Sequence, residues 1–127
     1  MTLYQLCLKR DFEASHFLIG GDWGVENQVH PHAYRLEWIL EGGDLDEHGY
    51  LVDLTNVEQH LEAVLAGYRG RVLNDLPGFA GINPSLEQFC RILSGQLAPR
   101  LAGEGLQAHV VRLWESETAW ASLRQTL

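Results

Sequence analysis

Three histidines of this chain are spaced so that they could hold a metal ion together. His30 and His32 are one residue apart, and alternate residues of an extended strand project from the same face. His16 ends a separate strand-like stretch, so the three imidazoles converge if the two strands pair. Three neutral imidazoles with one open position suit catalytic Zn²⁺, whose fourth site takes water or substrate. The pattern indicates a metal site at His16, His30 and His32, although isolated histidines also occur as ordinary surface or core residues.

Alternating strands must position these histidines. In the segment that begins at His30, the side chains of Tyr34, Leu36 and Trp38 share the face of the two histidines, as expected for a half-buried strand. The side chains of Phe12 and Ala14 likewise share one face of their strand with His16. The strand-like segments are 2–18, 30–41, 106–115 and 118–127.

Two amphipathic helices are expected between the strand pairs. Thr55 and Glu58 form a capping box, and apolar residues at helical spacing follow it as far as Gly67. Ser85 and Gln88 form a second such box. The order ββααββ predicts an α+β domain in which two helices cover one face of an antiparallel sheet.

Length and composition argue against several classes of function. With 127 residues the chain is expected to form one domain, 1–127. The net charge is −8 and no cluster of Lys and Arg occurs, so no nucleic-acid partner is expected. No apolar run or leader segment indicates a membrane partner or export. Two isolated cysteines, Cys7 and Cys90, fit a reducing compartment, and a cytoplasmic location is expected.

Six short motifs follow one another along almost the whole chain. They are Phe12-Glu13-Ala14-Ser15-His16, His30-Pro31-His32-Ala33-Tyr34, Gly49-Tyr50-Leu51-Val52-Asp53-Leu54, Leu73-Asn74-Asp75, Asn83-Pro84-Ser85-Leu86-Glu87-Gln88 and Trp114-Glu115-Ser116. They resemble F-x-A-x-H, H-G-H-N-Y, G-M-V-x-D-F, L-N-D, N-P-T-x-E-N and W-E-T of the 6-pyruvoyl-tetrahydropterin synthases. The chain is also similar to their bacterial relatives, the 6-carboxy-tetrahydropterin synthases of queuosine biosynthesis.

The resemblance implies a fold, a cofactor and a substrate. The fold is the tunnelling fold, in which subunits close a barrel as trimers and often pair as hexamers. The cofactor is Zn²⁺ on His16, His30 and His32, and the substrate is a pterin anchored by Glu115. A carboxylate can accept two parallel hydrogen bonds from the amino and ring N–H groups of a pterin. Without the resemblance, Glu115 would be interpreted as a solvated carboxylate at a strand end.

The chain departs from the family pattern at the positions of the residues that transfer protons. In the commonest bacterial pattern a catalytic cysteine lies four residues before the first histidine of H-G-H, and Glu26 has that position here. The family's Asp-His pair, just before L-N-D, aligns with Arg69 and Gly70. Within the metal strand, Pro31 and Ala33 replace the usual glycine and asparagine.

Glu26 has two interpretations. A carboxylate can act as a general base in a pocket that tunes its pKa. A subgroup of the family has glutamate in place of the cysteine, and its members resemble aldolases in cleaving dihydroneopterin triphosphate to 6-hydroxymethyl-dihydropterin. That glutamate is spaced slightly differently, and the subgroup generally keeps the Asp-His pair. Alternatively, Glu26 is an ordinary loop carboxylate.

The function favoured by these observations is a zinc-dependent pterin side-chain lyase or synthase. Its substrate would be 7,8-dihydroneopterin triphosphate or a related dihydropterin, with Glu26 as proton acceptor and a homo-oligomer, trimer or hexamer, as the active form. Three alternatives stay open: aldolase-type cleavage, a non-catalytic zinc- and pterin-binding homologue, and a structural zinc site completed by a fourth ligand.

Overall fold

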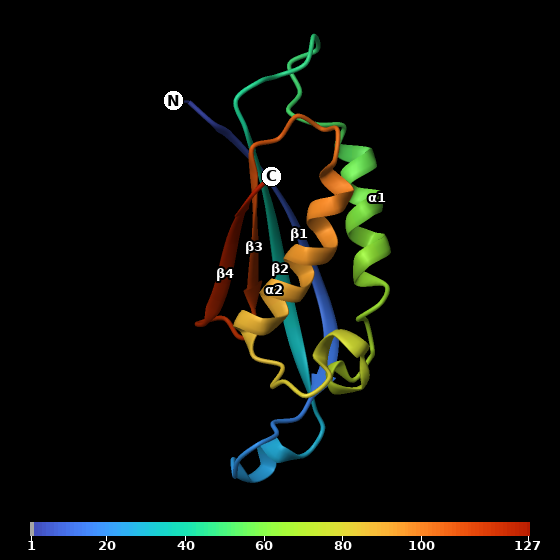
Figure 1. Cartoon of the computed structure of the whole chain (residues 1–127), viewed down its shortest axis with the longest axis vertical. Coiled ribbons are helices and arrows are strands. Elements are labelled where there is room, and N and C mark those ends of the chain that lie inside the picture. Colours follow the sequence, from blue (N-terminus) through green and yellow to red (C-terminus); the bar gives the residue numbers. More distant parts are fainter. Residues whose placement is uncertain (1) are drawn as a thin grey trace.

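The computed structural model describes residues 2–127. Its four strands form one antiparallel sheet in the order β1-β2-β3-β4, and two helices cover one face of that sheet (Figure 1). The predicted α+β order ββααββ is confirmed. The strands are β1 (Tyr4–His16), β2 (His30–Gly42), β3 (Ala108–Trp114) and β4 (Trp120–Thr126), and the helices are α1 (Leu54–Leu65) and α2 (Leu86–Leu97).

The long hairpin of β1 and β2 organises the core. The two strands pair along their whole length, from Tyr4 opposite Gly42 to His16 opposite His30. Their alternating apolar side chains face the apolar stripes of α1 and α2, and each large side chain buried there contributes about 1.5–3 kcal/mol. The fully buried residues include Leu36, Trp38, Leu40, Val57, Leu61, Leu65, Phe89, Leu93 and Leu97.

The first helix begins before the predicted capping box. Asp53 accepts a hydrogen bond from the Asn56 backbone N–H (3.4 Å), and the helix starts at Leu54. The predicted cap at Thr55 is therefore wrong. Asp53 still has extended backbone angles, whereas Thr55 already lies within the helix, where its hydroxyl cannot cap the first turn. Glu58 forms an ion pair with an arginine of β1.

The second helix begins where predicted. Ser85 is its N-cap and accepts a hydrogen bond from the Gln88 N–H (3.2 Å). Pro99 lies in a short 3₁₀ turn, Ala98–Leu101, that continues from the end of α2. No helix within residues 2–127 combines the length and apolar character needed to cross a bilayer.

The loop between β1 and β2 extends past the end of the sheet at which both strands carry their histidines (Figure 1). Two asparagine side chains tie its first residues to the body of the domain. Asn74 makes two hydrogen bonds to the backbone of Phe17, each 2.9 Å, and Asn83 accepts one from the Ile19 N–H (2.7 Å). The same loop contains the 3₁₀ helix Gly24–Asn27, which carries Glu26.

Candidate metal centre

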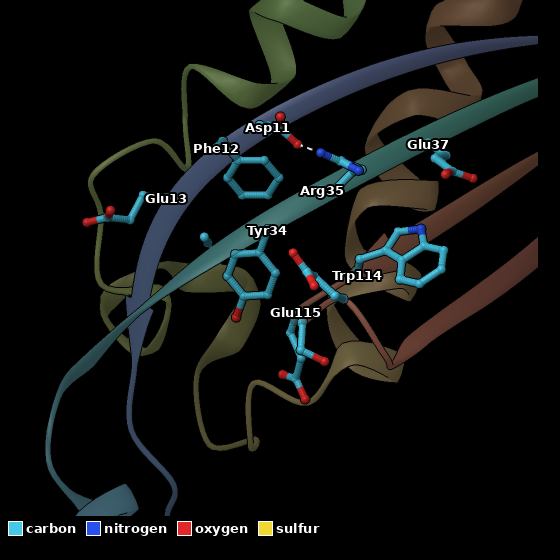
Figure 2. A pocket seen from close by; sticks show the side chains of 11 residues that line it. Asp11, Phe12, Glu13, Tyr34, Arg35, Glu37, Trp114 and Glu115 are labelled. Atoms are coloured by element: carbon cyan, nitrogen blue, oxygen red, sulfur yellow. Dashed lines mark hydrogen bonds and ion pairs between the residues drawn. The ribbon is translucent and has the colours of Figure 1, made fainter.

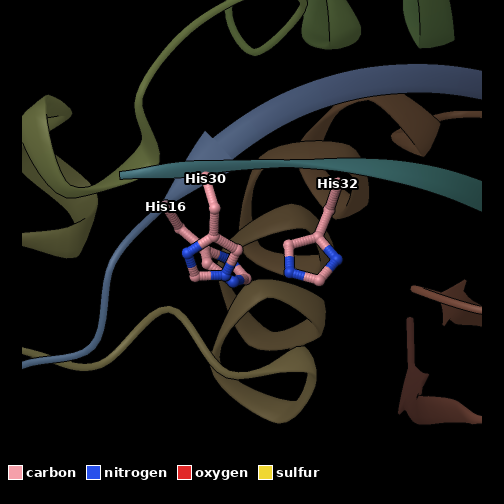
Figure 3. A group of neighbouring side chains, drawn as sticks. All are labelled: His16, His30 and His32. Atoms are coloured by element: carbon pink, nitrogen blue, oxygen red, sulfur yellow. The ribbon is translucent and has the colours of Figure 1, made fainter. Parts of the chain in front are cut away.

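The register of β1 and β2 brings the three predicted histidines together. His16 lies directly opposite His30, and His32 follows two residues later on the same face. The ring centroids are 4.4–4.9 Å apart, and one nitrogen from each ring lies within 4.8 Å of the other two (Figure 3). These distances place three imidazole donors around one small volume, as a three-histidine metal site requires.

Hydrogen bonds select the nitrogen that two of the histidines offer. A hydrogen bond of 2.8 Å joins His30 Nδ1 to the Gln28 carbonyl oxygen, and because a carbonyl only accepts, Nδ1 carries the proton. Nε2 of His30 therefore has a free lone pair. Nδ1 of His16 is bonded to the Tyr34 hydroxyl at 2.9 Å. Metal-binding histidines typically hold their second nitrogen in this way.

The surroundings keep His16 uncharged. Its side chain is buried at the end of β1. Burial first, and then the positive charge of His32 and His30 when protonated, lowers the pKa of His16 to about 4. At neutral pH its imidazole is therefore a lone-pair donor, which is the form that binds a metal. The donor set fits Zn²⁺, and imidazole also suits iron, copper and nickel.

A small cleft next to the histidines contains both predicted carboxylates. It has a volume of about 270 Å³ and is lined by Glu26, Glu115, His16 and His32, together with residues at the start of α2. Glu26 comes from the 3₁₀ helix of the β1–β2 loop and is exposed in the isolated chain. Glu115 directly follows β3 and is half-buried. Segments far apart in the sequence thus bring two carboxylates to the cleft beside the histidines.

A larger cleft of about 760 Å³ shares Glu115 with the small one. Figure 2 shows the side chains that line the larger cleft. Its walls include the aromatic side chains of Phe12, Tyr34 and Trp114. Flat aromatic surfaces beside a hydrogen-bonding carboxylate suit a planar heterocycle. The other residues lining the cleft are Asp11, Glu13, Ala33, Arg35, Glu37, Ser116 and Glu117.

Tyr34 contributes to the site in a way that sequence reasoning missed. The alternating pattern assigned it to the core face of β2, and its ring is indeed buried. Burial, and then the charge of Glu115, raises the pKa of Tyr34, so its hydroxyl stays protonated at physiological pH. Its position two residues after His32 was the available signal, because that spacing puts both side chains on one strand face.

The segment that aligns with the family's Asp-His pair has a different role here. Arg69 forms an ion pair with Glu62, and the Gly70 N–H donates a hydrogen bond to the Glu13 carbonyl of β1 (2.8 Å). Pro31 lies opposite Ser15 within the uninterrupted β1–β2 pairing. The departures therefore change side-chain chemistry without disrupting the strands.

The other histidines lie away from the cluster. His109 is fully buried: it accepts a hydrogen bond from Trp38 Nε1 at Nδ1 (2.9 Å), and its Nε2 lies 3.1 Å from the Ser94 hydroxyl. His48 is exposed in the polar turn after β2, and His60 lies on α1, 3.2 Å from an arginine nitrogen. His109 is therefore an interior residue of the domain.

The fold and the site define a class: α+β proteins in which a three-histidine cluster on a β-hairpin adjoins a carboxylate-bearing cleft. The chain matches the sequence model of the family described as 6-pyruvoyl tetrahydropterin synthase over residues 5–126, and it belongs to that family. An Archaeoglobus fulgidus protein provisionally named 6-carboxy-5,6,7,8-tetrahydropterin synthase is 28% identical over 119 residues, 93% of each chain. Membership supports a pterin side-chain synthase activity of the lyase class.

Solved structures share the fold over its whole length. The 6-pyruvoyl tetrahydropterin synthase of Caenorhabditis elegans superposes with a TM-score of 0.84 at 19% identity, covering 98% of this chain and 97% of that one. That of Plasmodium vivax superposes with a TM-score of 0.79 at 14% identity and covers both chains completely. The sheet and helices described above are therefore those of the tunnelling fold.

Proposed function

We propose that this chain is a zinc-dependent lyase or synthase that acts on the side chain of 7,8-dihydroneopterin triphosphate or a related dihydropterin. The observation that carries the proposal is the convergence of His16, His30 and His32 beside a cleft lined by Glu26 and Glu115. Family membership supports the pterin, and the convergence of three imidazoles, with His16 uncharged at neutral pH, supports the metal.

The histidines would hold the zinc ion, and the two carboxylates would act on the substrate. Bound zinc supplies a Lewis acid for the hydroxyl and carbonyl oxygens of the side chain. Glu115 would accept hydrogen bonds from the amino and ring N–H groups of the pterin, which orients the side chain toward the histidines. Glu26 would accept the proton that leaves the side chain.

A comparison supports the assignment of Glu26. The Plasmodium vivax 6-pyruvoyltetrahydropterin synthase has been solved as catalytic-residue mutants in which a glutamate is replaced by alanine or by cysteine. A glutamate is thus a catalytic residue in a protein of this fold. Glu26 is exposed in the single chain, so exclusion of water around it would depend on bound substrate or on a second subunit.

A turnover assay with separated products tests the proposal. Zinc-loaded protein is incubated with 7,8-dihydroneopterin and with its triphosphate, and Glu26→Gln and Glu47→Gln are assayed in parallel. Glu47 is an exposed carboxylate in the turn after β2 and serves as the control. We expect Glu26→Gln to lose about 10²–10⁴ in rate while keeping its zinc, and Glu47→Gln to match the wild type.

The products separate the alternatives. A 6-pyruvoyl or 6-carboxy product supports a synthase, whereas 6-hydroxymethyl-dihydropterin supports aldolase-type cleavage. Tight pterin binding without product would favour a non-catalytic homologue. Zinc loss in Glu26→Gln would reassign Glu26 as a metal ligand, and zinc retention in His30→Ala would contradict the metal centre.

The sheet edges support a homo-oligomer. β1 and β4 are the outer strands, and exposed large apolar residues lie on both, including Tyr4, Trp120 and Leu123. Unpaired strand edges with apolar side chains favour pairing with another copy. Light scattering coupled to size-exclusion chromatography should give a trimer or hexamer, and a monomer at micromolar concentration would contradict this part of the proposal.

A further inference from the structure

Tyr34 connects the histidine cluster to the larger cleft. Its side chain is 2% exposed, and its hydroxyl lies 2.9 Å from Nδ1 of His16, which is itself 5% exposed. The same side chain lines the cleft that Glu115 and Trp114 also line (Figure 2). One phenol group therefore contacts a candidate metal ligand and borders the space proposed for the pterin.

The bond to Tyr34 decides which nitrogen of His16 can bind a metal. A neutral imidazole has one N–H donor and one acceptor nitrogen. Because Nδ1 is bonded to Tyr34, Nε2 is the nitrogen left for the metal. Binding through Nε2 uses its lone pair, so the proton must sit on Nδ1, and Nδ1–H must donate to the Tyr34 oxygen. The hydroxyl hydrogen of Tyr34 is then available to another acceptor.

Packing fixes the position of this hydroxyl. The Tyr34 ring stacks on Phe12 with 5.3 Å between ring centroids and meets Phe89 edge to face, also at 5.3 Å. Tyr34 and Phe12 are direct neighbours across the β1–β2 pairing. A ring held from two sides in a packed core has little freedom to rotate, so its oxygen keeps a fixed place relative to His16.

We propose that Tyr34 is a positioning residue that accepts the hydrogen bond of His16 Nδ1–H, aims Nε2 of His16 at the metal, and turns its own O–H toward the pterin cleft at Glu115. The inference rests on the proposed three-histidine metal centre. It adds a physical connection between the metal end and the pterin end of the site, because both use one hydroxyl group. Removal of that group weakens metal binding and pterin binding together.

Tyr34→Phe tests the inference, because it removes the hydroxyl and keeps the ring. Tyr68→Phe is a matched control: Tyr68 is 4% exposed, packs on Phe89 at 5.2 Å between centroids, and donates its hydroxyl to Gln96 (2.6 Å). Zinc affinity is measured by competition with a chromophoric chelator. We expect Tyr34→Phe to bind zinc about 10–100-fold more weakly than the wild type, and Tyr68→Phe to stay within about twofold of it.

Two further measurements separate positioning from general stability. Thermal unfolding of the metal-free proteins should show a modest loss of stability for each variant, since each removes the hydrogen-bonded hydroxyl of a buried tyrosine. With Co²⁺ bound, the visible spectrum of Tyr34→Phe should differ from that of the wild type, because the His16 imidazole is no longer held at Nδ1. The spectrum of Tyr68→Phe should be unchanged.

Contrary results would overturn the inference at different levels. Equal zinc affinity in the wild type and Tyr34→Phe would overturn the role of Tyr34 and leave the metal centre intact. Equal losses in both tyrosine variants would assign the effect to stability, and so would also overturn it. If the wild type binds no zinc, or if His30→Ala binds zinc as well as the wild type, the proposed metal centre fails and the inference fails with it.

Discussion

At the scale of single residues, Glu115 occupies the point where the two clefts meet. It is half-buried directly after β3 and lines both the small cleft beside His16 and the larger aromatic cleft. A group at that junction can hold a ring in one cleft while the substituent of the ring enters the other. This geometry is what a pterin anchor needs.

Glu115→Gln should therefore weaken pterin binding while zinc affinity changes little. An amide offers one oxygen and one NH₂ group, so it cannot accept two parallel hydrogen bonds as a carboxylate does. Loss of a charge-assisted hydrogen bond corresponds to roughly 1.5–3 kcal/mol, or a Kd increase of about 10–150-fold. Pterin fluorescence measures the affinity. Glu117→Gln, a change to another carboxylate of the larger cleft, is the control, and an equal effect in both would contradict the anchor.

The histidines could be found from the sequence, whereas their partners could not. The H-x-H spacing and the strand period place His30 and His32 on one face, and the hairpin register adds His16. The bond between Tyr34 and His16 is a diagonal contact across the same two strands, and it also depends on the rotamers of both side chains. The local sequence pattern does not determine those rotamers.

At the scale of elements, the site depends on how the β1–β2 loop is held. This loop carries Glu26, and the side chains of Asn74 and Asn83 bind its first residues. Both asparagines belong to motifs in which this chain resembles the family, but neither lines the clefts described above. Their contribution is to fix where the chain leaves β1 after His16.

Asn74→Ala should destabilise the protein by roughly 1–3 kcal/mol, because it leaves both backbone groups of Phe17 without their partner. Urea unfolding of the metal-free protein measures the change. Asn83→Ala removes a single bond, to Ile19, and should cost less. A larger loss of unfolding free energy in Asn83→Ala than in Asn74→Ala would contradict the view that the bonds to Phe17 are the main attachment of the loop.

Sequence patterns located the elements better than they located the element ends. The strand period and the helical stripes depend on many residues, and all four strands and both helices occur where predicted. The start of α1 depended on the choice between Asp53 and Thr55, which are both good capping residues. Tertiary contacts decided that choice, because Glu58, the expected partner of Thr55, forms an ion pair with Arg10.

A buried histidine should make the packing of the sheet against α2 sensitive to acid. His109 accepts a hydrogen bond from Trp38, and its other nitrogen lies near the neutral side chains of Ser94 and Gln125. Burial, the larger effect, lowers the pKa of His109 below its unfolded value of about 6.5, against the smaller opposing effect of Gln125. Below about pH 6.5 the unfolded chain therefore binds more protons at His109 than the folded chain does. The contribution of His109 to the free energy of unfolding is fully present above about pH 6.5 and is lost as the pH falls toward the lower pKa of the folded state.

His109→Gln should show a smaller loss of stability on acidification than the wild type. Urea unfolding of both metal-free proteins from about pH 7.5 down to about pH 5 measures the difference in slope. His16 also titrates in the folded protein with a lowered pKa, but its contribution is common to both proteins and cancels in the comparison. Identical pH profiles would show that the His109 network stays intact when the imidazole is protonated.

At the scale of the whole molecule, charge limits what the site can accept. The chain has a net charge of −8, and five of its nine basic side chains form ion pairs with carboxylates. Within residues 2–127, Arg35 is the one basic residue that lines the two clefts, and it is paired with Asp11 (2.9 Å). The other charged side chains that line the clefts are Glu13, Glu26, Glu37, Glu87, Glu115 and Glu117.

Such surroundings oppose a polyphosphate, so we expect 7,8-dihydroneopterin to bind more tightly than its triphosphate. A few carboxylates within several ångströms of the phosphates, in a partly solvated cleft, are enough to repel them by about 1.4 kcal/mol. That energy corresponds to a Kd about tenfold higher for the triphosphate. Isothermal titration of the zinc-loaded protein with both compounds measures the ratio. Because salt screens such charges over about 8 Å at physiological ionic strength, the preference should shrink as salt is added.

Tighter binding of the triphosphate that weakens with salt would show instead that a second subunit brings unpaired cations to the clefts. In that case the complete site would be a property of the oligomer.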